Sequence, residues 1–282
     1  ITHAPLDYHK TFAEYIRAKK LFFDGLPKGA FALTNADDRN GRVMVQNTAA
    51  AVSAYSLRAM ADFRCKIVEM HLDGMLLRID GQELWVGLLG RFNAYNLLAV
   101  YGAAVLLGLD RGEVLRVLSM LHAVSGRFEK IRAANGTTAI VDYAHTPDAL
   151  ENVIQTIEEI RTPGQQLIVV CGCGGDRDRT KRPEMAAIAV KYATTAVFTS
   201  DNPRHESPEA ILDDMVAGLE PGARYLRIAD RAEAIRTAVM LSRPGDIILV
   251  AGKGHETYQI VGDVKHPFDD REEIKKRFAL LN

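Results

Sequence analysis

The stretch of sequence that decides the fold is Leu167-Ile168-Val169-Val170-Cys171-Gly172-Cys173-Gly174-Gly175-Asp176-Arg177-Asp178-Arg179. It begins with an apolar, mostly β-branched run, which is typical of a buried strand. A loop of glycine and charged residues follows at once. Ligands of open parallel sheets bind outside the carboxyl ends of the strands, where such loops emerge. The stretch therefore predicts a strand-to-helix connection that contributes to a ligand site.

Two further loops of this kind follow strand-like runs later in the chain. Asp201-Asn202-Pro203-Arg204 comes after the apolar run 196–200, and Gly252-Lys253-Gly254-His255-Glu256 comes after the run 247–251. In a parallel sheet all three loops emerge at the same edge. We therefore expect them to converge on one small zwitterionic or phosphorylated ligand.

Beyond residue 125, strand-like and helical runs alternate, and this alternation predicts an α/β domain with a parallel sheet. Three of the expected helices begin near a proline, which suits the first helical turn. The expected strands are residues 137–141, 166–171, 195–200, 224–228 and 246–250, and the expected helices are 147–160, 183–192, 208–219 and 232–241.

The first part of the chain has a different pattern. A β-meander is expected over residues 64–86, with Asp73-Gly74 and Asp80-Gly81 as hairpin turns. We place the domain boundary near residues 123–127, which gives domains of residues 1–124 and 125–282. The other elements expected in the first domain are a strand at 30–35 and helices at 6–23, 48–60, 92–107 and 111–121.

The composition excludes several classes of protein. The formal net charge of the 282 residues is −1, which argues against nucleic-acid binding driven by phosphate neutralisation. No run approaches the roughly 20 apolar residues of a membrane helix. The three cysteines, Cys65, Cys171 and Cys173, cannot all pair with one another, and their scarcity suits a reducing cytosol. We therefore expect a cytoplasmic protein with small-molecule ligands and with no nucleic-acid or membrane partner.

Anion binding is expected at the first of the three loops. Backbone N–H groups of a glycine turn, and the helix N-terminus behind it, attract negative charge. Arg177 and three further basic residues reinforce this attraction. The alternative is an ordinary glycine turn beside a solvated basic face. Cys171 and Cys173 are best explained as incidental thiols, because no second cysteine pair accompanies them.

The residue types in the other two loops suit the two charges of an amino-acid head group. The guanidinium of Arg204 matches a carboxylate bidentately, and Asn202 can serve either charge. Glu256 can hold an ammonium group, and Gly252 lets the backbone approach closely. The plainer alternatives are a helix-entry turn capped by Asp201 and a tight glycine turn.

Residues suited to a nucleotide lie nearby in the sequence. Asp142 ends the run 137–141, a place where an aspartate commonly binds ribose hydroxyls. His145 is more often a structural histidine than a catalyst. Arg127 lies at the domain junction, where it can contact a phosphate or form a salt bridge of little energetic value.

The N-terminal segment gives only loose indications of metal chemistry. His3, Asp7 and His9 are ligand types, but Pro5 disfavours a helix that would align them, and no cysteine is near. The pattern therefore does not favour a closed zinc site. On spacing alone, Lys19 is an exposed helix lysine.

Together these motifs resemble the Mur ligase family, and the resemblance covers essentially the whole chain. The motifs similar to the second half of the family's central ATPase domain are Leu6-Asp-Tyr-His9, Tyr15-x-x-Ala-Lys19, Asn35-Ala-Asp-Asp38 and Phe92-Asn-Ala-Tyr-Asn96. The motifs similar to its C-terminal domain are Gly126-Arg-Phe-Glu129, Asp142-Tyr-Ala-His-Thr-Pro-Asp148, Gly172-Cys-Gly-Gly-Asp-Arg-Asp178 with Lys181-Arg-Pro183, Asp201-Asn-Pro-Arg204 and Gly252-Lys-Gly-His-Glu256.

The resemblance implies a partial central domain followed by a Rossmann-like C-terminal domain with a mainly parallel sheet. It implies an ATP-dependent ligase of peptidoglycan precursor synthesis, with ATP and Mg²⁺ as cofactors. The most similar members add meso-2,6-diaminopimelate to UDP-N-acetylmuramoyl-L-alanyl-D-glutamate. In the family, ATP phosphorylates a substrate carboxylate, the incoming amine attacks the acyl phosphate, and phosphate leaves.

The resemblance also implies roles for individual residues. Lys19 matches a catalytic lysine that family members carbamylate, and a carbamate would be an anionic oxygen ligand for Mg²⁺. Arg204 would favour the distal carboxylate of diaminopimelate and repel the distal ammonium of lysine. The residues expected to bind diaminopimelate are Arg177, Asp201, Asn202, Arg204, Gly252 and Glu256, and those expected to line the nucleotide are Asn93, Asn96, Arg127, Asp142 and His145.

Departures from the family pattern limit what the chain is expected to do. Ala4-Pro5 stands where the family has Asp-His, whose histidine is a metal ligand, and His3 is offset by two positions. The phosphate-binding Gly-Lys-Thr loop is absent from these residues, which begin at Ile1. We therefore expect a part of a longer enzyme that does not ligate alone. Its incomplete central sheet is expected to leave an unpaired edge that favours self-association.

Two other hypotheses stay open. The chain could be a non-catalytic amino-acid-binding module that kept the pocket and lost the ATPase, which Ala4-Pro5 favours. It could also be a related ligase that uses L-lysine or glutamate.

Overall fold

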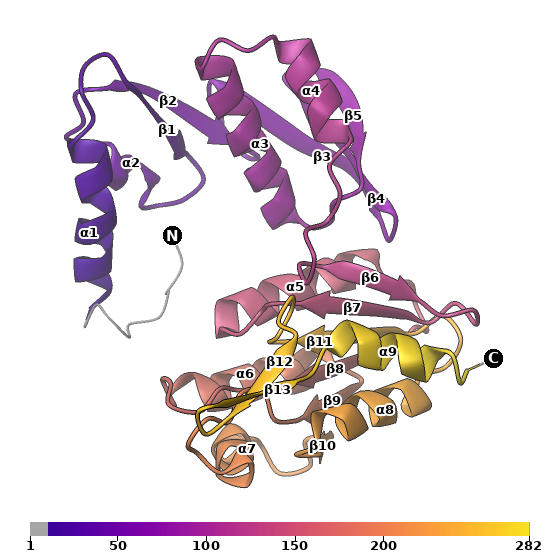
Figure 1. The fold of residues 1–282 in the computed structure, drawn as a ribbon. Helices are drawn as coiled ribbons and strands as arrows, with labels where there is room; N and C mark the ends of the chain where they lie inside the picture. The colour runs from indigo at the N-terminus through magenta and orange to yellow at the C-terminus, as the bar shows by residue number, and fades with distance from the viewer. Residues whose placement is uncertain (1–10, 282) are drawn as a thin grey trace. The chain divides into compact units, whose positions relative to one another are not determined.

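The computed structural model describes residues 11–281, which form two compact units that divide between His122 and Ala123 (Figure 1). The first unit is built on a mixed sheet of order β1-β2-β3-β4-β5, parallel from β1 to β3 and antiparallel from β3 to β5. Its strands are β1 (Phe31–Asn35), β2 (Ala51–Ser56), β3 (Phe63–His71), β4 (Gly74–Ile79) and β5 (Gln82–Val86), and its helices are α1 (Phe12–Asp24), α2 (Gly41–Met44), α3 (Arg91–Leu106) and α4 (Arg111–Ser119).

Helix α3 supplies the core of the first unit. It packs against β1, β2 and β3, and its residues Leu98 and Tyr101 are buried. The ring of Tyr101 meets that of Phe63 on β3 edge to face, with the ring centroids 5.9 Å apart. This contact joins the helix to the middle of the sheet.

Two expectations for the first unit are wrong. The helix expected over residues 48–60 is instead β2, which pairs with β1 on one side and β3 on the other. The run is short and apolar, so its periodicity does not separate strand from helix, and pairing on both sides decides. The expected turn at Asp73-Gly74 is also displaced, because Gly74 already opens β4 opposite His71. The Asp80-Gly81 turn is confirmed, with φ angles of 47° and 88°.

The second unit is an α/β sheet of order β10-β9-β8-β11-β7-β6, in which the pairs from β10 to β7 are parallel and edge strand β6 is antiparallel to β7. A separate hairpin, β12–β13, follows the last sheet strand. The strands are β6 (Glu129–Arg132), β7 (Thr138–Asp142), β8 (Leu167–Cys171), β9 (Thr195–Phe198), β10 (Tyr225–Arg227), β11 (Ile247–Ala251), β12 (Tyr258–Val261) and β13 (Val264–Pro267), and the helices are α5 (Pro147–Ile160), α6 (Lys181–Tyr192), α7 (Pro208–Val216), α8 (Arg231–Leu241) and α9 (Asp270–Phe278).

Helices cover both faces of this sheet (Figure 1). Helices α8 and α9 pack together on one face, where Ile235 and Phe278 join Val170 and Val250 in one core cluster. Helices α5, α6 and α7 pack in a row on the other face. Every residue of β7, β8 and β11 is buried, as continuous apolar runs in a sheet covered on both sides require.

The predicted α/β architecture of the second part is confirmed. Strands β6, β12 and β13 and helix α9 were not predicted from the sequence. Within residues 11–281, no helix is both long and apolar enough to cross a membrane.

Candidate functional site

The three loops predicted from the sequence leave β8, β9 and β11, and the order β9-β8-β11 makes these strands neighbours. The first loop lies directly on the second. A Cβ built on Gly175 would lie 1.9 Å from the carbonyl oxygen of Pro203, and the Gly175 N–H donates to the carbonyl of Asn202 at 2.9 Å. Glycine is therefore needed here because any side chain would separate the loops.

Asn202 joins the second loop to the third. Its Nδ2 donates to Oε2 of Glu256 at 2.9 Å. Its Oδ1 accepts from Nζ of Lys253 and from the backbone N–H of Ile260, both at 3.0 Å. Lys253 Nζ also donates to Glu256 Oε2 at 3.0 Å. An amide, an ammonium and a carboxylate thus form one closed triangle.

Glu256 is held in its ionised form by this triangle. Burial pushes its pKa up, but hydrogen bonds from Asn202 and Lys253 outweigh burial and leave the pKa below its usual value. The group is therefore a carboxylate at neutral pH. A carboxylate at a loop edge can bind a ligand ammonium.

Arg204 lies on the other side of Asn202. Its Nη1 donates to the carbonyl of Gly175 at 2.9 Å and to the carbonyl of Asn202 at 3.5 Å. Its backbone has a φ of 50°, which is uncommon for a residue with a side chain. The β12–β13 hairpin holds that conformation, because Arg204 N–H donates to Ile260 and the Arg204 carbonyl accepts from Gly262.

A second arginine lies beside Arg204. A Cβ built on Gly174 would lie 2.9 Å from Nη1 of Arg204 and 3.6 Å from Cγ of Arg177. The two cationic side chains therefore flank the same glycine. Their charges suit a carboxylate of a small ligand.

Asp201 lies beneath the loop rather than at its surface. Its side chain contacts Gly252, whose φ is 117° and whose Cβ, if present, would lie 2.5 Å from Asp201 Oδ2. Burial raises the pKa of Asp201, against the opposing pull of Arg231 and Lys253. Asp201 is one of the residues expected to bind diaminopimelate, and the structure places it against the backbone of Gly252.

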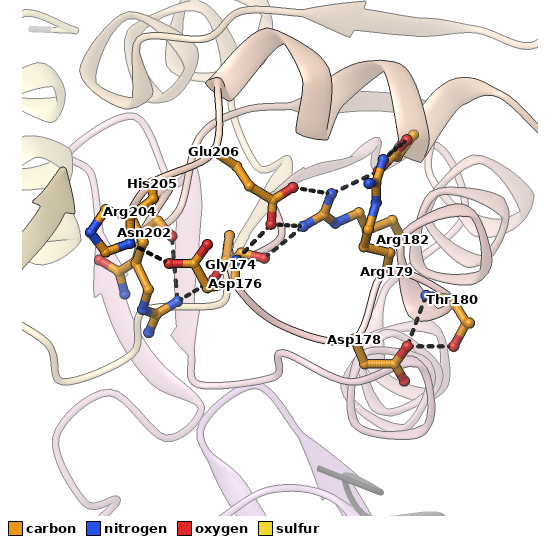
Figure 2. Close-up of polar contacts among 12 residues, drawn as sticks. Gly174, Asp176, Asp178, Arg179, Thr180, Arg182, Asn202, Arg204, His205 and Glu206 are labelled. Atoms are coloured by element: carbon orange, nitrogen blue, oxygen red, sulfur yellow. Dashed lines mark hydrogen bonds and ion pairs between the residues drawn. The ribbon is translucent and has the colours of Figure 1, made fainter. Parts of the chain in front are cut away.

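A fully buried arginine braces the first loop from behind (Figure 2). Arg182 donates through Nη1 and Nη2 to both carboxylate oxygens of Glu206, at 2.9 and 2.8 Å. It also donates to Asp214 at 2.7 Å and to the Gly174 carbonyl at 3.3 Å. Glu206 in turn accepts from the N–H of Asp176 at 2.6 Å. The solvated basic face offered as an alternative is therefore wrong for Arg182.

The carboxyl ends of β9 and β11 are tied to α9 by a closed ion pair. Arg231 bonds both oxygens of Asp270, at 2.7 and 2.8 Å, and both side chains are fully buried. The same guanidinium donates to the carbonyl oxygens of Ser200 and Ala251. Sequence analysis missed this pair and the Arg182 brace, because neither has a short-range spacing signal.

Three of the expected nucleotide residues gather around Tyr143. Arg127 lies over its ring, 4.6 Å from the centroid, and the ring of His145 is 4.6 Å away. Asp142 precedes it and accepts backbone N–H bonds from Phe128 and Ala144, both at 2.8 Å. Burial raises the pKa of Asp142, partly offset by these two bonds and by Arg127.

This cluster, consisting of Arg127, Asp142, Tyr143 and His145, contacts the third loop. The ring of His255 lies 5.2 Å from that of Tyr143. A Cβ built on Gly126 would lie 2.0 Å from the backbone nitrogen of His255. The groups suited to a nucleotide and to an amino acid therefore share one continuous loop surface in the second unit.

The remaining candidates belong to the first unit. Asn93 and Asn96 lie together on α3, where Asn96 donates to Asn93 at 3.4 Å and Asn93 donates to the Leu89 carbonyl at 2.7 Å. Lys19 lies on α1 with its Nζ 4.8 Å from the centroid of the Tyr15 ring. The catalytic role of Lys19 stays a prediction.

The expectations about metal ligands fall mostly outside the described residues, since His3, Ala4-Pro5, Asp7 and His9 all precede residue 11. Across residues 11–281 no cluster of three or more histidine, cysteine, aspartate or glutamate side chains is arranged to hold a metal ion. Asp37 belongs to the motif Asn35-Ala-Asp-Asp38. In the structure its carboxylate accepts hydrogen bonds from the hydroxyl groups of Ser56 and Tyr95.

Comparison with known families agrees with this organisation. Residues 1–104 match the Mur ligase middle domain, and residues 126–254 match the Mur ligase glutamate ligase domain. The UDP-N-acetylmuramoyl-L-alanyl-D-glutamate–2,6-diaminopimelate ligase of Parabacteroides distasonis is 58% identical over 281 residues, covering 99% of this chain and 58% of that protein. The ligase of the same name from Bacillus cereus is 44% identical over 286 residues, covering 98% of this chain and 58% of that protein.

Solved structures lead to the same family. A structure of a UDP-N-acetylmuramoyl-L-alanyl-D-glutamate–2,6-diaminopimelate ligase has a TM-score of 0.63 at 36% identity, covering 99% of this chain and 59% of that one. MurF ligase from Thermotoga maritima, in complex with ADP, has a TM-score of 0.70 at 16% identity, covering 97% of this chain and 58% of that one, and shows likeness of fold alone. The chain thus spans 58% of the length of the curated relatives described above.

The resemblance drawn from the motifs is confirmed. Both domain matches fall on the two compact units of the structure, and the relatives match nearly every position of the chain. Taken with the loops that gather at the edge of the second sheet, these matches show that the chain belongs to the Mur ligase family.

Proposed function

We propose that this chain is the part of an ATP-dependent ligase that binds the incoming amino acid and much of the nucleotide. The amino acid is meso-2,6-diaminopimelate, and the complete enzyme joins it to UDP-N-acetylmuramoyl-L-alanyl-D-glutamate in peptidoglycan precursor synthesis. Residues 1–124 are part of the central ATPase domain, and residues 125–282 are the amino-acid-binding domain. The names of the relatives support this substrate.

The observation that carries the proposal is the cluster formed by Asn202, Arg204 and Glu256. Asn202 bonds Glu256 through its side chain and Arg204 through its carbonyl, so an acid and a guanidinium flank one residue. An ammonium and a carboxylate on one carbon fit such a pair of groups. The distal end of diaminopimelate is of that kind, whereas lysine ends in an ammonium alone.

In this proposal each residue has a separate task. Glu256 binds the distal ammonium, and Arg204, with Arg177 beside it, binds the distal carboxylate. Asn202 keeps Glu256 and Arg204 in register, and Gly252 leaves room for the ligand with Asp201 beneath it. The proximal amine is then held for attack on the activated carboxylate, and this positioning is the chain's main contribution to catalysis.

The cluster around Tyr143 suits a nucleotide. The guanidinium of Arg127 is available for a phosphate, and Asp142 retains lone pairs for a ribose hydroxyl beyond its two backbone bonds. His145 completes the aromatic surface. Asn93 and Asn96, both on α3, are also proposed as nucleotide-binding residues. Bound ATP supplies the phosphoryl group that turns the substrate carboxylate into an acyl phosphate.

The residue proposed to contribute to Mg²⁺ binding is Lys19. A carbamate on Lys19 would supply an oxygen ligand of the type that Mg²⁺ prefers. Within residues 11–281 no group of three or more histidine, cysteine, aspartate or glutamate side chains is arranged to hold a metal ion. Mg²⁺ therefore enters the proposal only as the usual partner of ATP.

The test is a calorimetric titration of the 282-residue chain with meso-2,6-diaminopimelate and with L-lysine. Losing a hydrogen bond between charged groups costs about 1.5–3 kcal/mol, so lysine should bind about tenfold or more weakly. Replacement Arg204→Met should remove most of that preference. Equal binding of the two amino acids by the unaltered chain would contradict the proposed substrate and favour a lysine-using relative.

A further inference from the structure

A buried lysine lies in the middle of the three loops and has no assigned task in the proposal above. The side chain of Lys253 is fully buried, and lysine is almost never buried in this way unless it is paired. Its two hydrogen-bond acceptors among the described residues are Asn202 Oδ1 and Glu256 Oε2, each at 3.0 Å. Both acceptors belong to the proposed amino-acid site.

Lys253 donates a hydrogen bond to one carboxylate oxygen of Glu256 and does not bond the other. Oε2 accepts from both Lys253 and Asn202, while Oε1 receives no hydrogen bond from residues 11–281. The Glu256 side chain is 16% exposed, so it reaches the surface that Lys253 does not. A ligand ammonium would therefore bind through Oε1, on a carboxylate that already has a counter-ion.

The charges around the site determine what such a ligand must carry. Lys253 and Glu256 cancel, and Arg204 adds a positive charge beside them. Two other charged groups, Arg231 and Asp270, form a closed pair with no net charge. Asp201 is buried beneath Gly252 and contributes at most one negative charge, while Arg177, which flanks Gly174 together with Arg204, adds a second positive charge. A lone ammonium therefore meets net positive charge, whereas an ammonium with a neighbouring carboxylate brings no net charge.

We propose that Lys253 is a specificity-determining residue, whose ammonium neutralises Glu256 in advance and so rejects amino acids that end in an ammonium without an adjacent carboxylate. The inference rests on the proposed function. It makes Lys253, in addition to Arg204, a residue that discriminates diaminopimelate from lysine. Lys253 also positions Asn202, because its bond to Oδ1 turns Nδ2 toward Glu256. Discrimination then comes from a repulsive element as well as an attractive one.

The experiment measures the ratio of the dissociation constants of L-lysine and meso-2,6-diaminopimelate in the 282-residue chain. Lys253→Gln removes the charge but keeps a donor for Asn202 or Glu256, and Lys253→Met removes both. Lys191→Met is the matched control, because this lysine is 63% exposed and pairs only with Glu151 among charged groups of the described chain. Melting temperatures are recorded for each variant.

A like charge opposite an incoming ammonium is strongly unfavourable. Both Lys253 variants should therefore lower the ratio of the L-lysine to the diaminopimelate dissociation constant by about tenfold, and the control should leave this ratio unchanged. The decrease should come mainly from tighter lysine binding, which a merely structural role would not produce. If Lys253→Gln weakens both ligands by the same factor, or leaves the ratio as it was, the inference is overturned. If the unaltered chain shows no preference for diaminopimelate, the proposed function fails instead.

Discussion

Two buried cations in the second unit, Arg231 and Lys253, differ in the solvent exposure of the acids that they pair with. Arg231 forms a bidentate pair with Asp270 in which neither side chain is exposed. Lys253 is buried to the same degree, but its partner Glu256 reaches the surface. A buried charge therefore does not by itself mark a binding site. What marks one is a partner with unused hydrogen-bonding capacity on the solvent side.

The difference assigns separate tasks to two parts of the same sheet edge. The Arg231–Asp270 pair fixes the ends of β9 and β11 against α9 and has no capacity left for a ligand. The Lys253–Glu256 pair is supported by that frame and remains open on one side. The partners of Arg182 are more exposed still, with Glu206 at 24% and Asp214 at 27%, but both oxygens of Glu206 already accept hydrogen bonds from Arg182.

Breaking the closed pair should have the largest effect on stability. Arg231→Met leaves the Asp270 carboxylate buried without a counter-ion, which should lower the free energy of unfolding by about 3–5 kcal/mol. Urea denaturation of the variant measures this loss. The double variant Arg231→Met with Asp270→Leu should recover most of it, since an apolar pair of similar volume is often neutral. A single variant as stable as the parent would show that the pair is not the frame.

The next largest effect on stability is expected where Gly126 contacts the third loop at His255. Gly126 has a φ of 68°, and an added Cβ would lie 2.0 Å from a backbone nitrogen, whereas Gly164 has a φ of 93° with nothing within 4 Å. Gly164→Ala should cost about 1–2 kcal/mol from backbone strain alone. Gly126→Ala should cost more, because the loops must also separate. Equal losses in the two variants, by urea denaturation, would mean that the loop contact adds nothing.

A smaller, pH-dependent effect is expected at Glu206. The Arg182 guanidinium holds the pKa of Glu206 at about 2, against an ordinary value of 4.5. Because the folded-state pKa is the lower one, ionised Glu206 stabilises the fold above pH 4.5, and the contribution is lost as pH falls toward 2. The stability difference between the parent and Glu206→Gln should be about 1–2 kcal/mol at pH 7. Urea denaturation at a series of pH values would count against the brace if that difference stayed constant with pH.

The smallest effect is expected at Asp214, the second acid bound by Arg182, where it also meets an exposed cation. Arg179 bonds Asp214 at 2.9 Å through two nitrogens, but its side chain is 64% exposed. Arg179→Met should therefore cost less than about 1 kcal/mol. Arg182→Met, which removes the buried partner of Asp214, should cost several times more in the same urea assay. Similar costs would show that burial does not separate the two arginines.

Much of the second unit could be predicted because its signals are local. Strands buried on both faces appear as continuous apolar runs. Helices α5 and α7 each begin with a proline in the first turn, which is a local start signal. The missed strands carry no such signal: β13 is exposed throughout, and β6 has no buried residue. In the first unit, β2 was misassigned because its pairing with β1 and β3 is not visible in its own residues.

The sequence predicts which loops form the site, but it does not predict which side chains pair with one another there. Glycine and charge after a strand indicated where a ligand site would form, and the structure brings Asn202, Lys253 and Glu256 into direct contact. The partners of Arg182 lie 24 and 32 positions away, and that of Arg231 lies 39 positions away. Only the topology of the sheet brings such residues together. The burial of Lys253 likewise depends on how the loops pack.

We propose that loops from three strands of the second unit together bind an ammonium and a carboxylate on one carbon. A crystal structure of the chain with meso-2,6-diaminopimelate tests it most directly. We expect the distal ammonium within hydrogen-bond distance of Glu256 Oε1 and the distal carboxylate on the guanidinium of Arg204. Ligand bound elsewhere, or bound here with its distal ammonium facing Arg204, would contradict it.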